Sequence, residues 1–262
     1  MNSSVLQNLD NNTLQNCNIC PVGEKNEITI YDIYKTIVLS VLIPVVGSFG
    51  AIGNGLAAYI YSRPVMRSSV NLYLCALAVS DCVVIVSAFF LFFLLSIECS
   101  GGATVSYLYG LSAPYLYPAS MTAQTASVYF VIAAAGDCFI CTVLPLRFKE
   151  KWCNGQRAKR FIAIIALFSV SYNMVHWFEV TNVECFEPGF NTTSLIPVPT
   201  AFRRNELYYK IYYTYLYTLI MAVGPLILLI ALNTTIIIST YAITKPTFDN
   251  DESAEASNSF IL

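Results

Sequence analysis

The sequence predicts an all-α transmembrane protein built as a helical bundle. Hydrophobic residues make up 56% of the 262 residues and charged residues only 11%, whereas a soluble domain carries about 25% charged residues. The mean hydropathy is +0.60. Five apolar stretches follow one another, and each reaches the length of about 20 residues that a helix needs to cross a bilayer. This composition excludes a soluble fold, and the lack of a basic face excludes nucleic-acid binding.

The predicted elements fall into three regions. Residues 1–35 form a polar N-terminal segment, residues 36–243 a five-helix membrane domain, and residues 244–262 a polar tail. The first apolar stretch begins too far along the chain, and is too long, for an ordinary signal peptide, so we expect it to remain as the first span. The spans are predicted near 37–60, 72–97, 113–146, 161–180 and 207–243.

Basic residues predict the orientation of the spans. Arg63 and Arg67 follow span one, a larger basic group follows span three, and no Lys or Arg lies between spans two and three. Since Lys and Arg accumulate in cytoplasmic loops, we expect a multi-pass plasma-membrane protein with an extracellular N-terminus and a cytoplasmic C-terminus. Arg203, Arg204 and Lys210 then lie outside, in a long loop where the charge rule weakens. The basic group comprises Arg147, Lys149, Lys151, Arg157, Lys159 and Arg160.

Asn-x-Ser/Thr sequences agree with this orientation. Asn2, Asn11 and Asn191 lie in such sequences on the predicted outer side, where glycosylation occurs. Asn233 also fits the pattern, but it falls within span five, out of reach of the glycosylation enzyme. We therefore predict glycans on the first three residues.

The nine cysteines divide by compartment. Those within the spans are predicted to be buried thiols, and Cys153, in a cytoplasmic loop, should be reduced. A bridge between Cys99, at the outer end of span two, and Cys185, in the loop after span four, would hold that loop over the mouth of the bundle. Cys17 and Cys20 pair with each other or elsewhere, and the sequence does not choose between these pairings. The thiols within the spans are Cys75, Cys82, Cys138 and Cys141.

Polar residues inside the spans need partners, because charged groups in hydrocarbon are costly. Asn54 stands between Gly53 and Gly55 in span one, and Asp81 lies deep in span two. Asn54 can serve simply as an interhelical hydrogen-bond partner. Asp81 needs a cation, a proton or a polar cluster, and a protonated Asp81 bonded to Asn54 is one solution. Pro225 in span five is ordinary, because membrane helices tolerate proline.

Taken in order, these residues resemble those of the rhodopsin-like G-protein-coupled receptors. The resemblance covers Thr36–Ile243 and implies a bundle of the first five of seven spans. Because only residues 244–262 follow, we expect a chain truncated after the fifth span and incomplete for signalling alone. The matching features are Asn54 between small residues, Leu77-Ala78 followed by Asp81, Asp137 followed by Pro145-Leu146, and Pro225.

Several segments are similar to the FMRFamide-type neuropeptide receptors of invertebrates, especially those of nematodes. These segments open span three, close span four and open span five, and the resemblance implies a peptide ligand at the outer mouth of the bundle. They are Pro114-Tyr115, Thr122–Tyr129, Tyr172-Asn173, Trp177-Phe178-Glu179, Pro199-Thr200, Arg204-Asn205-Glu206 and Ile211-Tyr212-Tyr213.

The same resemblance implies ligand-binding residues near the outer rim. Carboxylates and aromatic faces suit an Arg-Phe-amide peptide through charge pairing, stacking and cation–π contact. Aromatic side chains also gather at membrane interfaces without binding a ligand, and glutamates in outer loops are usually only solvated. The candidates are Glu98, Tyr115, Gln124, Glu179 and Tyr212.

Two further sites are implied by the resemblance. Asp81 stands where the family binds sodium, with Asn54 as its neighbour, and this site is incomplete without residues of span seven. Asp137-Cys138-Phe139 stands where the family has Asp/Glu-Arg-Tyr, so Cys138 replaces the arginine that contacts the G protein. A thiol has no charge and donates weakly. We therefore do not expect this chain alone to couple to a heterotrimeric G protein.

The principal hypothesis is a neuropeptide-receptor homologue with a peptide ligand, surrounded by membrane lipid. The alternative is a non-signalling regulatory membrane protein that binds peptide or binds full-length receptors as a hetero-oligomer. A transporter fragment lacks support, since neither an internal repeat nor a pair of broken helices is apparent. We expect no enzyme and no cofactor, because the sequence has no His/Glu metal cluster, nucleophile motif or phosphate loop, and His176 is its only histidine.

Overall fold

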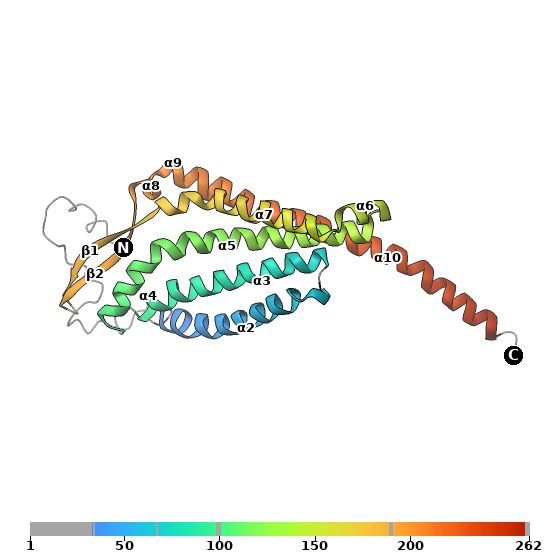
Figure 1. Cartoon of the computed structure of the whole chain (residues 1–262), viewed down its shortest axis with the longest axis horizontal. Helices are drawn as coiled ribbons and strands as arrows, with labels where there is room; N and C mark the ends of the chain where they lie inside the picture. Colours follow the sequence, from blue (N-terminus) through green and yellow to red (C-terminus); the bar gives the residue numbers. More distant parts are fainter. Residues whose placement is uncertain (1–32, 34, 67, 98–100, 189–190, 260–262) are drawn as a thin grey trace. The chain divides into compact units, whose positions relative to one another are not determined.

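A computed structural model of the chain describes residues 33, 35–66, 68–97, 101–188 and 191–259. Figure 1 shows that these residues form long helices with one β-hairpin between two of them. The chain divides into two compact units, and each is described by itself. Unit 1 comprises Met1–Ser48, Val86–Ala119 and Val175–Arg204, and unit 2 comprises Phe49–Ile85, Ser120–Met174 and Asn205–Leu262.

Five helices in the described part of the chain are long and apolar enough to cross a membrane, which confirms the predicted all-α transmembrane fold. They run over Ile37–Tyr61, Ser69–Ile97, Ala103–Val143, Gly155–Phe178 and Glu206–Ala242. Short helices connect or precede some of these spans. They are η3 (Pro64–Met66), α6 (Leu146–Trp152) and α8 (Ala201–Arg204).

Most spans consist of consecutive helical segments, because stretches of π-helix or 3-10 helix alternate with α-helix. The third span is the exception, since α5 (Ala103–Val143) is α-helical throughout. The other segments are η2 (Lys35–Leu42) and α2 (Ile43–Tyr61), then α3 (Ser69–Ala88), η4 (Phe89–Phe93) and α4 (Leu94–Ile97), then α7 (Gly155–Asn173) and η5 (Met174–Phe178), and finally α9 (Glu206–Tyr208), η6 (Tyr209–Val223) and α10 (Gly224–Ser259).

Two helix boundaries differ from the predicted spans. Helix α5 begins at Ala103, well before the predicted start near residue 113, and it includes both Pro114 and Pro118. A membrane helix accommodates proline when neighbouring groups satisfy the freed carbonyls. At the other end of the chain, α10 continues to Ser259, through most of the residues predicted as a polar tail.

Pro225 lies at the start of α10, directly after the π-helical segment η6. The Gly224 N–H bonds to the carbonyl of Leu219, five residues earlier, which is the π-helical pattern. A side chain at Gly224 would collide with that carbonyl. Proline has no N–H to donate, so the helix changes from the π to the α pattern where a backbone donor is missing.

A β-hairpin occupies the segment between spans four and five, where the sequence predicted only a loop. Strands β1 (Val180–Glu187) and β2 (Thr192–Pro199) pair antiparallel in a register that sets Val180 opposite Pro199. Asn191 belongs to the turn and has a positive φ of 50°. Asparagine is one of the few residues that adopt this conformation readily.

In unit 1 the hairpin packs against the first turns of α5. The hydroxyls of Ser106 and Ser194 lie 2.8 Å apart, and both side chains are buried. A Cβ atom at Gly110 would overlap the carbonyl of Leu195. Glycine at this position therefore allows the strand to approach the helix closely.

In unit 2, hydrogen bonds connect helices of different spans. Such polar contacts are expected between membrane helices, where apolar burial alone gives little net attraction. The bonds are Cys75 Sγ to the Ala58 carbonyl (3.6 Å), Ser127 Oγ to Asp81 Oδ1 (2.6 Å), Asn173 Nδ2 to Thr125 Oγ1 (2.8 Å) and Tyr129 Oη to the Ile220 carbonyl (3.1 Å).

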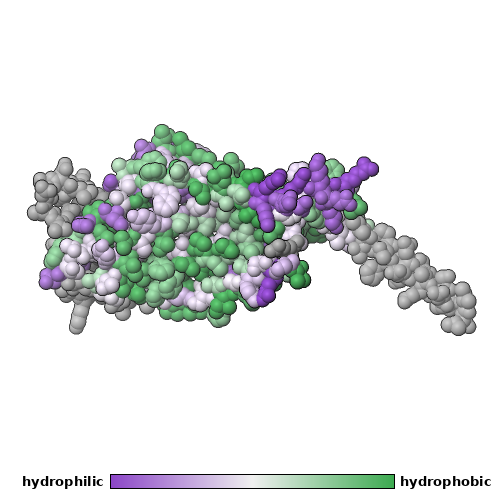
Figure 2. All heavy atoms as spheres, viewed as in Figure 1, coloured by the Kyte–Doolittle hydropathy of each residue, from purple (hydrophilic) through white to green (hydrophobic). Residues whose placement is uncertain are grey.

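The surface of the helices is largely apolar. Figure 2 shows hydrophobic side chains along the helices and a hydrophilic group over α6 and the start of α7. On α2, Phe49 and Ile52 are among the most exposed large apolar side chains. Exposed apolar surface of this extent fits helices that face lipid tails.

Candidate functional site

A pocket of about 430 Å³ lies within unit 1. Ligand sites are typically about 300–1,000 Å³ and mainly apolar with a few polar groups. Here the wall is aliphatic, aromatic and proline-rich, and Arg203 of α8 is its charged member. The lining residues are Leu91, Phe92, Leu95, Tyr109, Ala113, Tyr117, Val180, Pro197, Val198, Pro199 and Arg203.

Helical periodicity explains which face of α5 lines the pocket. Tyr109, Ala113 and Tyr117 are spaced four residues apart, so they follow one another along one face of the helix. Tyr115 lies halfway around the helix from Ala113 and Tyr117. It is 61% exposed and packs edge-on against Trp177, with 6.4 Å between the ring centroids.

Arg203 connects this pocket to a buried polar cluster formed with Tyr117, Glu179 and His176. Arg203 Nη1 donates to Tyr117 Oη at 3.0 Å and to Glu179 Oε2 at 2.9 Å. His176 Nδ1 lies 3.0 Å from the same carboxylate oxygen. The side chains of His176 and Glu179 are fully buried, whereas that of Arg203 is 34% exposed. Glu179 is therefore the inner member of the cluster, and Arg203 and Tyr117 are the members that reach the pocket.

Thr200 fixes the position of Arg203. The hydroxyl of Thr200 donates to the Phe178 carbonyl at 2.7 Å and accepts the Arg203 N–H at 3.4 Å. The Thr200 N–H also donates to the Glu179 carbonyl at 2.9 Å. Thr200 thus caps α8 at its N-terminus and holds this helix beside the carboxylate that Arg203 contacts.

The predicted ligand-binding residues do not gather at this pocket. Glu98 lies outside the described residues. Glu179 faces Arg203 and His176, so its carboxylate is directed at protein groups, and Tyr115 is on another face of α5. The other two belong to unit 2, where Gln124 is exposed and Tyr212 is buried.

Tyr212 belongs to a stack of aromatic rings within unit 2. Its ring centroid lies 5.5 Å from that of Tyr172 and 5.5 Å from that of Tyr208. Its hydroxyl donates to the Tyr172 carbonyl at 3.2 Å. These contacts give Tyr212 a role in packing η6 against α7.

The predicted sodium-site residues have separate partners. Asp81 accepts a hydrogen bond from Ser127 of α5, whereas Asn54 donates to the Gly50 carbonyl of its own helix at 3.0 Å. A sodium ion requires several oxygen ligands directed at one point. The structure supplies Ser127 as the hydroxyl next to Asp81, and the bond made by Asn54 turns its amide toward α2. The sodium site stays a prediction, and Ser127 replaces Asn54 as the contact of Asp81.

Asp137, Cys138 and Phe139 lie near the end of α5. Asp137 is buried, and Ser69 Oγ donates to its Oδ2 at 2.5 Å. Among the described residues, no Lys, Arg or His forms an ion pair with Asp137. Cys138 and Phe139 are half-buried. Within the described part of the chain, the carboxylate therefore has a neutral partner, Ser69, and no cationic one.

Cys141 and Cys153 differ from the prediction of separate thiols. The structure joins them by a disulfide, because Pro145 and α6 turn the chain back and bring Cys153 to the side of α5. Cys75, Cys82 and Cys138 are free, as expected for thiols within spans, but they are half-buried and not buried. Cys185 is also disulfide-bonded. Its predicted partner Cys99 lies outside the described residues, so that pairing stays a prediction.

The predicted glycosylation sites are only partly described. Asn2 and Asn11 lie outside the described residues. Asn191 is exposed in the turn of the hairpin. Its glycosylation stays a prediction.

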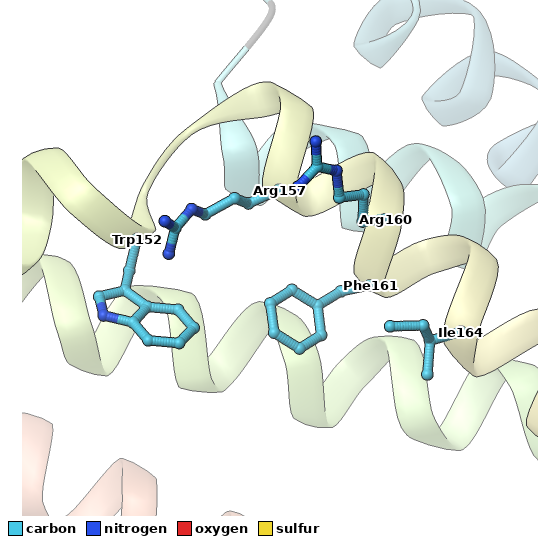
Figure 3. A pocket seen from close by; sticks show the side chains of 5 residues that line it. All are labelled: Trp152, Arg157, Arg160, Phe161 and Ile164. Atoms are coloured by element: carbon cyan, nitrogen blue, oxygen red, sulfur yellow. The ribbon is translucent and has the colours of Figure 1, made fainter.

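A second pocket, of about 230 Å³, lies in unit 2 at the start of α7. Figure 3 shows Arg157 extending toward Trp152 across this pocket, and the guanidinium carbon lies 4.9 Å from the ring centroid. Phe161, Arg160 and Ile164 complete the wall. Cation–π contacts of this kind, together with interfacial aromatic residues, suit the boundary between lipid and water.

Arg203 and His176 are the residues that the sequence did not single out. Arg203 appeared only as a charge in an outer loop, and His176 as an isolated histidine. The spacing of His176 and Glu179, three residues apart, was a usable signal for their contact. Nothing local marks Arg203 as the partner of Glu179, because the two lie 24 positions apart in the sequence, on either side of the hairpin.

Comparisons with known proteins identify the family. Residues 53–259 match the 7 transmembrane receptor (rhodopsin family). The chain is 36% identical over 245 residues to the probable G-protein coupled receptor frpr-1 of Caenorhabditis elegans, which covers 88% of this chain and 65% of that protein. It is 34% identical over 216 residues to the FMRFamide receptor of Drosophila melanogaster, covering 81% of this chain and 38% of that one.

A third relative, the FMRFamide peptide receptor frpr-18 of Caenorhabditis elegans, is 27% identical over 198 residues, which is 75% of this chain and 45% of that protein. The chain thus spans 65% or less of the length of these curated relatives.

The fold and its polar contacts define a multi-pass helical membrane protein of the receptor class. The chain belongs to the rhodopsin family of seven-transmembrane receptors, and it is a homologue of the FMRFamide-type neuropeptide receptors. The resemblance predicted from the sequence is confirmed. The family is one of receptors and not a class of enzymes.

Proposed function

We propose that the chain forms the first five helices of a plasma-membrane neuropeptide receptor, with its N-terminus extracellular and its C-terminus cytoplasmic. In this proposal the pocket of unit 1 opens to the extracellular side and binds part of an FMRFamide-like peptide. The basic residues on α6 and at the start of α7 support the orientation, because Lys and Arg favour the cytoplasmic face.

The observation that carries this proposal is the chemistry of the pocket wall. Phe92, Tyr109 and Tyr117 offer aromatic rings, and aromatic pairs are favourable at centroid distances of about 4.5–7 Å. A phenylalanine side chain of an FMRFamide-like peptide matches such a wall. Arg203 adds guanidinium N–H groups, which can donate to a carbonyl of the peptide amide.

The peptide arginine is assigned to aromatic faces and not to Glu179. Glu179 already accepts a hydrogen bond from Arg203 and lies beside His176, so a peptide arginine would compete with Arg203 for the same carboxylate. Contact with the face of Tyr109 or Tyr117 requires no such exchange. Glu98 stays a candidate carboxylate of the binding site.

Binding of a labelled FMRFamide peptide to cells that display the chain tests the pocket. Val180→Trp would fill the pocket, and Tyr117→Ala would remove an aromatic wall. Each is expected to weaken binding at least about tenfold, equivalent to about 1.4 kcal/mol. Tyr115→Ala and Arg204→Ala are matched controls, since neither residue lines the pocket.

An N-terminal tag measures how much of each variant reaches the cell surface. Wild-type affinity for Val180→Trp at normal surface level would exclude this pocket as the peptide site. Equal losses in Tyr115→Ala and Tyr117→Ala would exclude the assigned face of α5.

The second candidate is a membrane protein that binds peptide, or full-length receptors, without signalling. Cys138 favours it, because a neutral thiol occupies the position of the family arginine. Co-expression with a full-length FMRFamide receptor separates the two. Altered surface delivery or signalling of that receptor supports the regulatory role, and a G-protein response from this chain alone contradicts it.

A further inference from the structure

A cluster of three metal-binding side chains lies at the end of α5. Asp137 and Cys141 are one helical turn apart and therefore share a face of α5. Cys153 approaches from the turn after α6. One ligand atom from each residue lies within 4.8 Å of the other two. All three residues belong to unit 2.

The surroundings of Asp137 suit a cation. Its carboxylate is buried and accepts a hydrogen bond from Ser69, and no Lys, Arg or His of the described chain pairs with it. A buried carboxylate without a positive partner is unfavourable. Hydrogen bonds to a ligating carboxylate are characteristic of metal sites, and Ser69 provides one here.

The compartment decides the state of the two cysteines. The fold brings their sulfur atoms into bonding contact, yet disulfides are rare in the reducing cytoplasm. In the orientation of the proposed function, on which this step rests, Cys141 and Cys153 face the cytoplasm and are thiols. Two thiols beside a carboxylate form a donor set that zinc prefers.

We propose that Asp137, Cys141 and Cys153 bind one zinc ion, which fastens the end of α5 to the turn after α6. Zinc–ligand bonds of about 2.0–2.3 Å place tetrahedral ligand atoms roughly 3.3–3.8 Å apart, so the cluster needs only small side-chain adjustments. Binding releases the thiol protons, and a water molecule completes the coordination. The ion supplies positive charge beside Asp137, one residue from Cys138, where the family has arginine.

Cobalt titration of the purified full chain under reducing conditions tests the site. Cys17 and Cys20 are replaced by Ser throughout, because a Cys-x-x-Cys pair can bind metal by itself. We expect a thiolate-to-cobalt charge-transfer band that saturates at about one ion per chain and disappears when zinc is added. Cys141→Ser and Cys153→Ser should lose the band.

Matched variants separate the ligands from their neighbours. Cys138→Ser changes a free cysteine next to Asp137 and should keep the band. Asp137→Asn should weaken binding, and Ser69→Ala should weaken it about 10–100-fold, as is usual for a partner of a ligand. A band that persists in Cys153→Ser would overturn the proposal.

Two measurements on the chain with both Cys141 and Cys153 present guard against variants that fail to fold. Zinc should protect these cysteines from maleimide, and absence of both protection and the cobalt band would overturn the site. Peptide mapping of alkylated protein isolated from cells is the second measurement. If it finds Cys141 bonded to Cys153, the two cysteines form a structural disulfide and the zinc site is excluded. Failure of peptide binding bears only on the proposed function, because the cobalt titration needs neither ligand nor orientation.

Discussion

Glu179 illustrates how much a residue's role depends on its surroundings. From the sequence it was an outer-loop carboxylate suited to a peptide arginine. In the fold it accepts a hydrogen bond from Arg203, lies 3.0 Å from His176 Nδ1 and is fully buried. A carboxylate in this state stabilises the protein through its partners and holds Arg203 in position.

Replacing Glu179 by Gln should lower the stability of the chain. The variant keeps the shape but removes the charge that balances Arg203. Loss of one partner of a buried pair costs about 3–5 kcal/mol, and we expect roughly 1–3 kcal/mol here because Arg203 is partly exposed. Thermal unfolding of the purified chain in detergent measures the change. The exposed Glu184→Gln is the control, and an equal shift in both would contradict the buried pair.

Asp81 allows a second test among single residues. Residues in contact show non-additive effects of about 0.5–3 kcal/mol in double-mutant cycles. We expect coupling between Asp81→Asn and Ser127→Ala, because these side chains share a hydrogen bond. Asp81→Asn and Asn54→Ala should be additive, since Asn54 bonds to its own helix. Unfolding midpoints of the single and double variants give the answer, and the reverse pattern would favour the predicted Asp81–Asn54 pair.

Helix α5 is the element on which both proposed sites depend. One face near its start carries Tyr109, Ala113 and Tyr117 toward the pocket, and its last turns carry Asp137 and Cys141. Gly110 permits β2 to pack against this helix. The four-residue spacing thus places these three side chains on the pocket wall. The lack of a side chain at Gly110 lets the hairpin pack closely against the helix.

Two glycines of α5 provide a matched prediction at this scale. Gly136→Ala meets no atom within 4 Å and should stabilise the helix by about 0.5–1 kcal/mol, because alanine is the better helix former. Gly110→Ala should destabilise the chain, since its methyl group would overlap the Leu195 carbonyl. Unfolding temperatures of the two variants provide the comparison. Stabilisation by Gly110→Ala would show that the hairpin does not pack there.

For the whole molecule, the function of each proposed site depends on how the chain is oriented in the membrane. In the proposed orientation the hairpin is extracellular, which would make the pocket of unit 1 accessible to peptide. The same orientation places α6 in the cytoplasm, where Cys141 and Cys153 would be reduced. The distribution of Lys and Arg supports this arrangement through a general rule about loops. A direct test of the orientation needs a covalent modification that occurs in only one compartment.

Glycosylation supplies that mark. Asn191 lies exposed in the hairpin turn, and a glycan there requires exposure to the lumen during synthesis. We expect enzymatic deglycosylation to increase gel mobility, and Asn191→Gln to remove one part of that shift. Asn233→Gln alters a sequon within a membrane span and should leave mobility unchanged. If Asn233→Gln removes a glycan and Asn191→Gln does not, the proposed orientation is wrong.

Most of the fold could be predicted from the sequence, and less of the pocket could. Long apolar stretches predict membrane spans, because the thickness of the bilayer sets their length and lipid offers the backbone no hydrogen-bond partners. The hairpin was missed because its packing with α5 depends on contacts distant in sequence. Of the pocket residues, the sequence indicates Arg203 only as a charge in an outer loop.

The class of protein, the five spans and the receptor family follow from the amino-acid sequence, because composition and the order of Asn54, Asp81, Asp137 and Pro225 are properties of the chain before it folds. Which polar groups meet depends on the folded arrangement. In the structure Glu179 pairs with Arg203, Asp81 accepts a hydrogen bond from Ser127, and Cys153 lies beside Cys141 and Asp137. The reason is physical: buried polar groups must find partners, and the folded chain decides which groups are within reach.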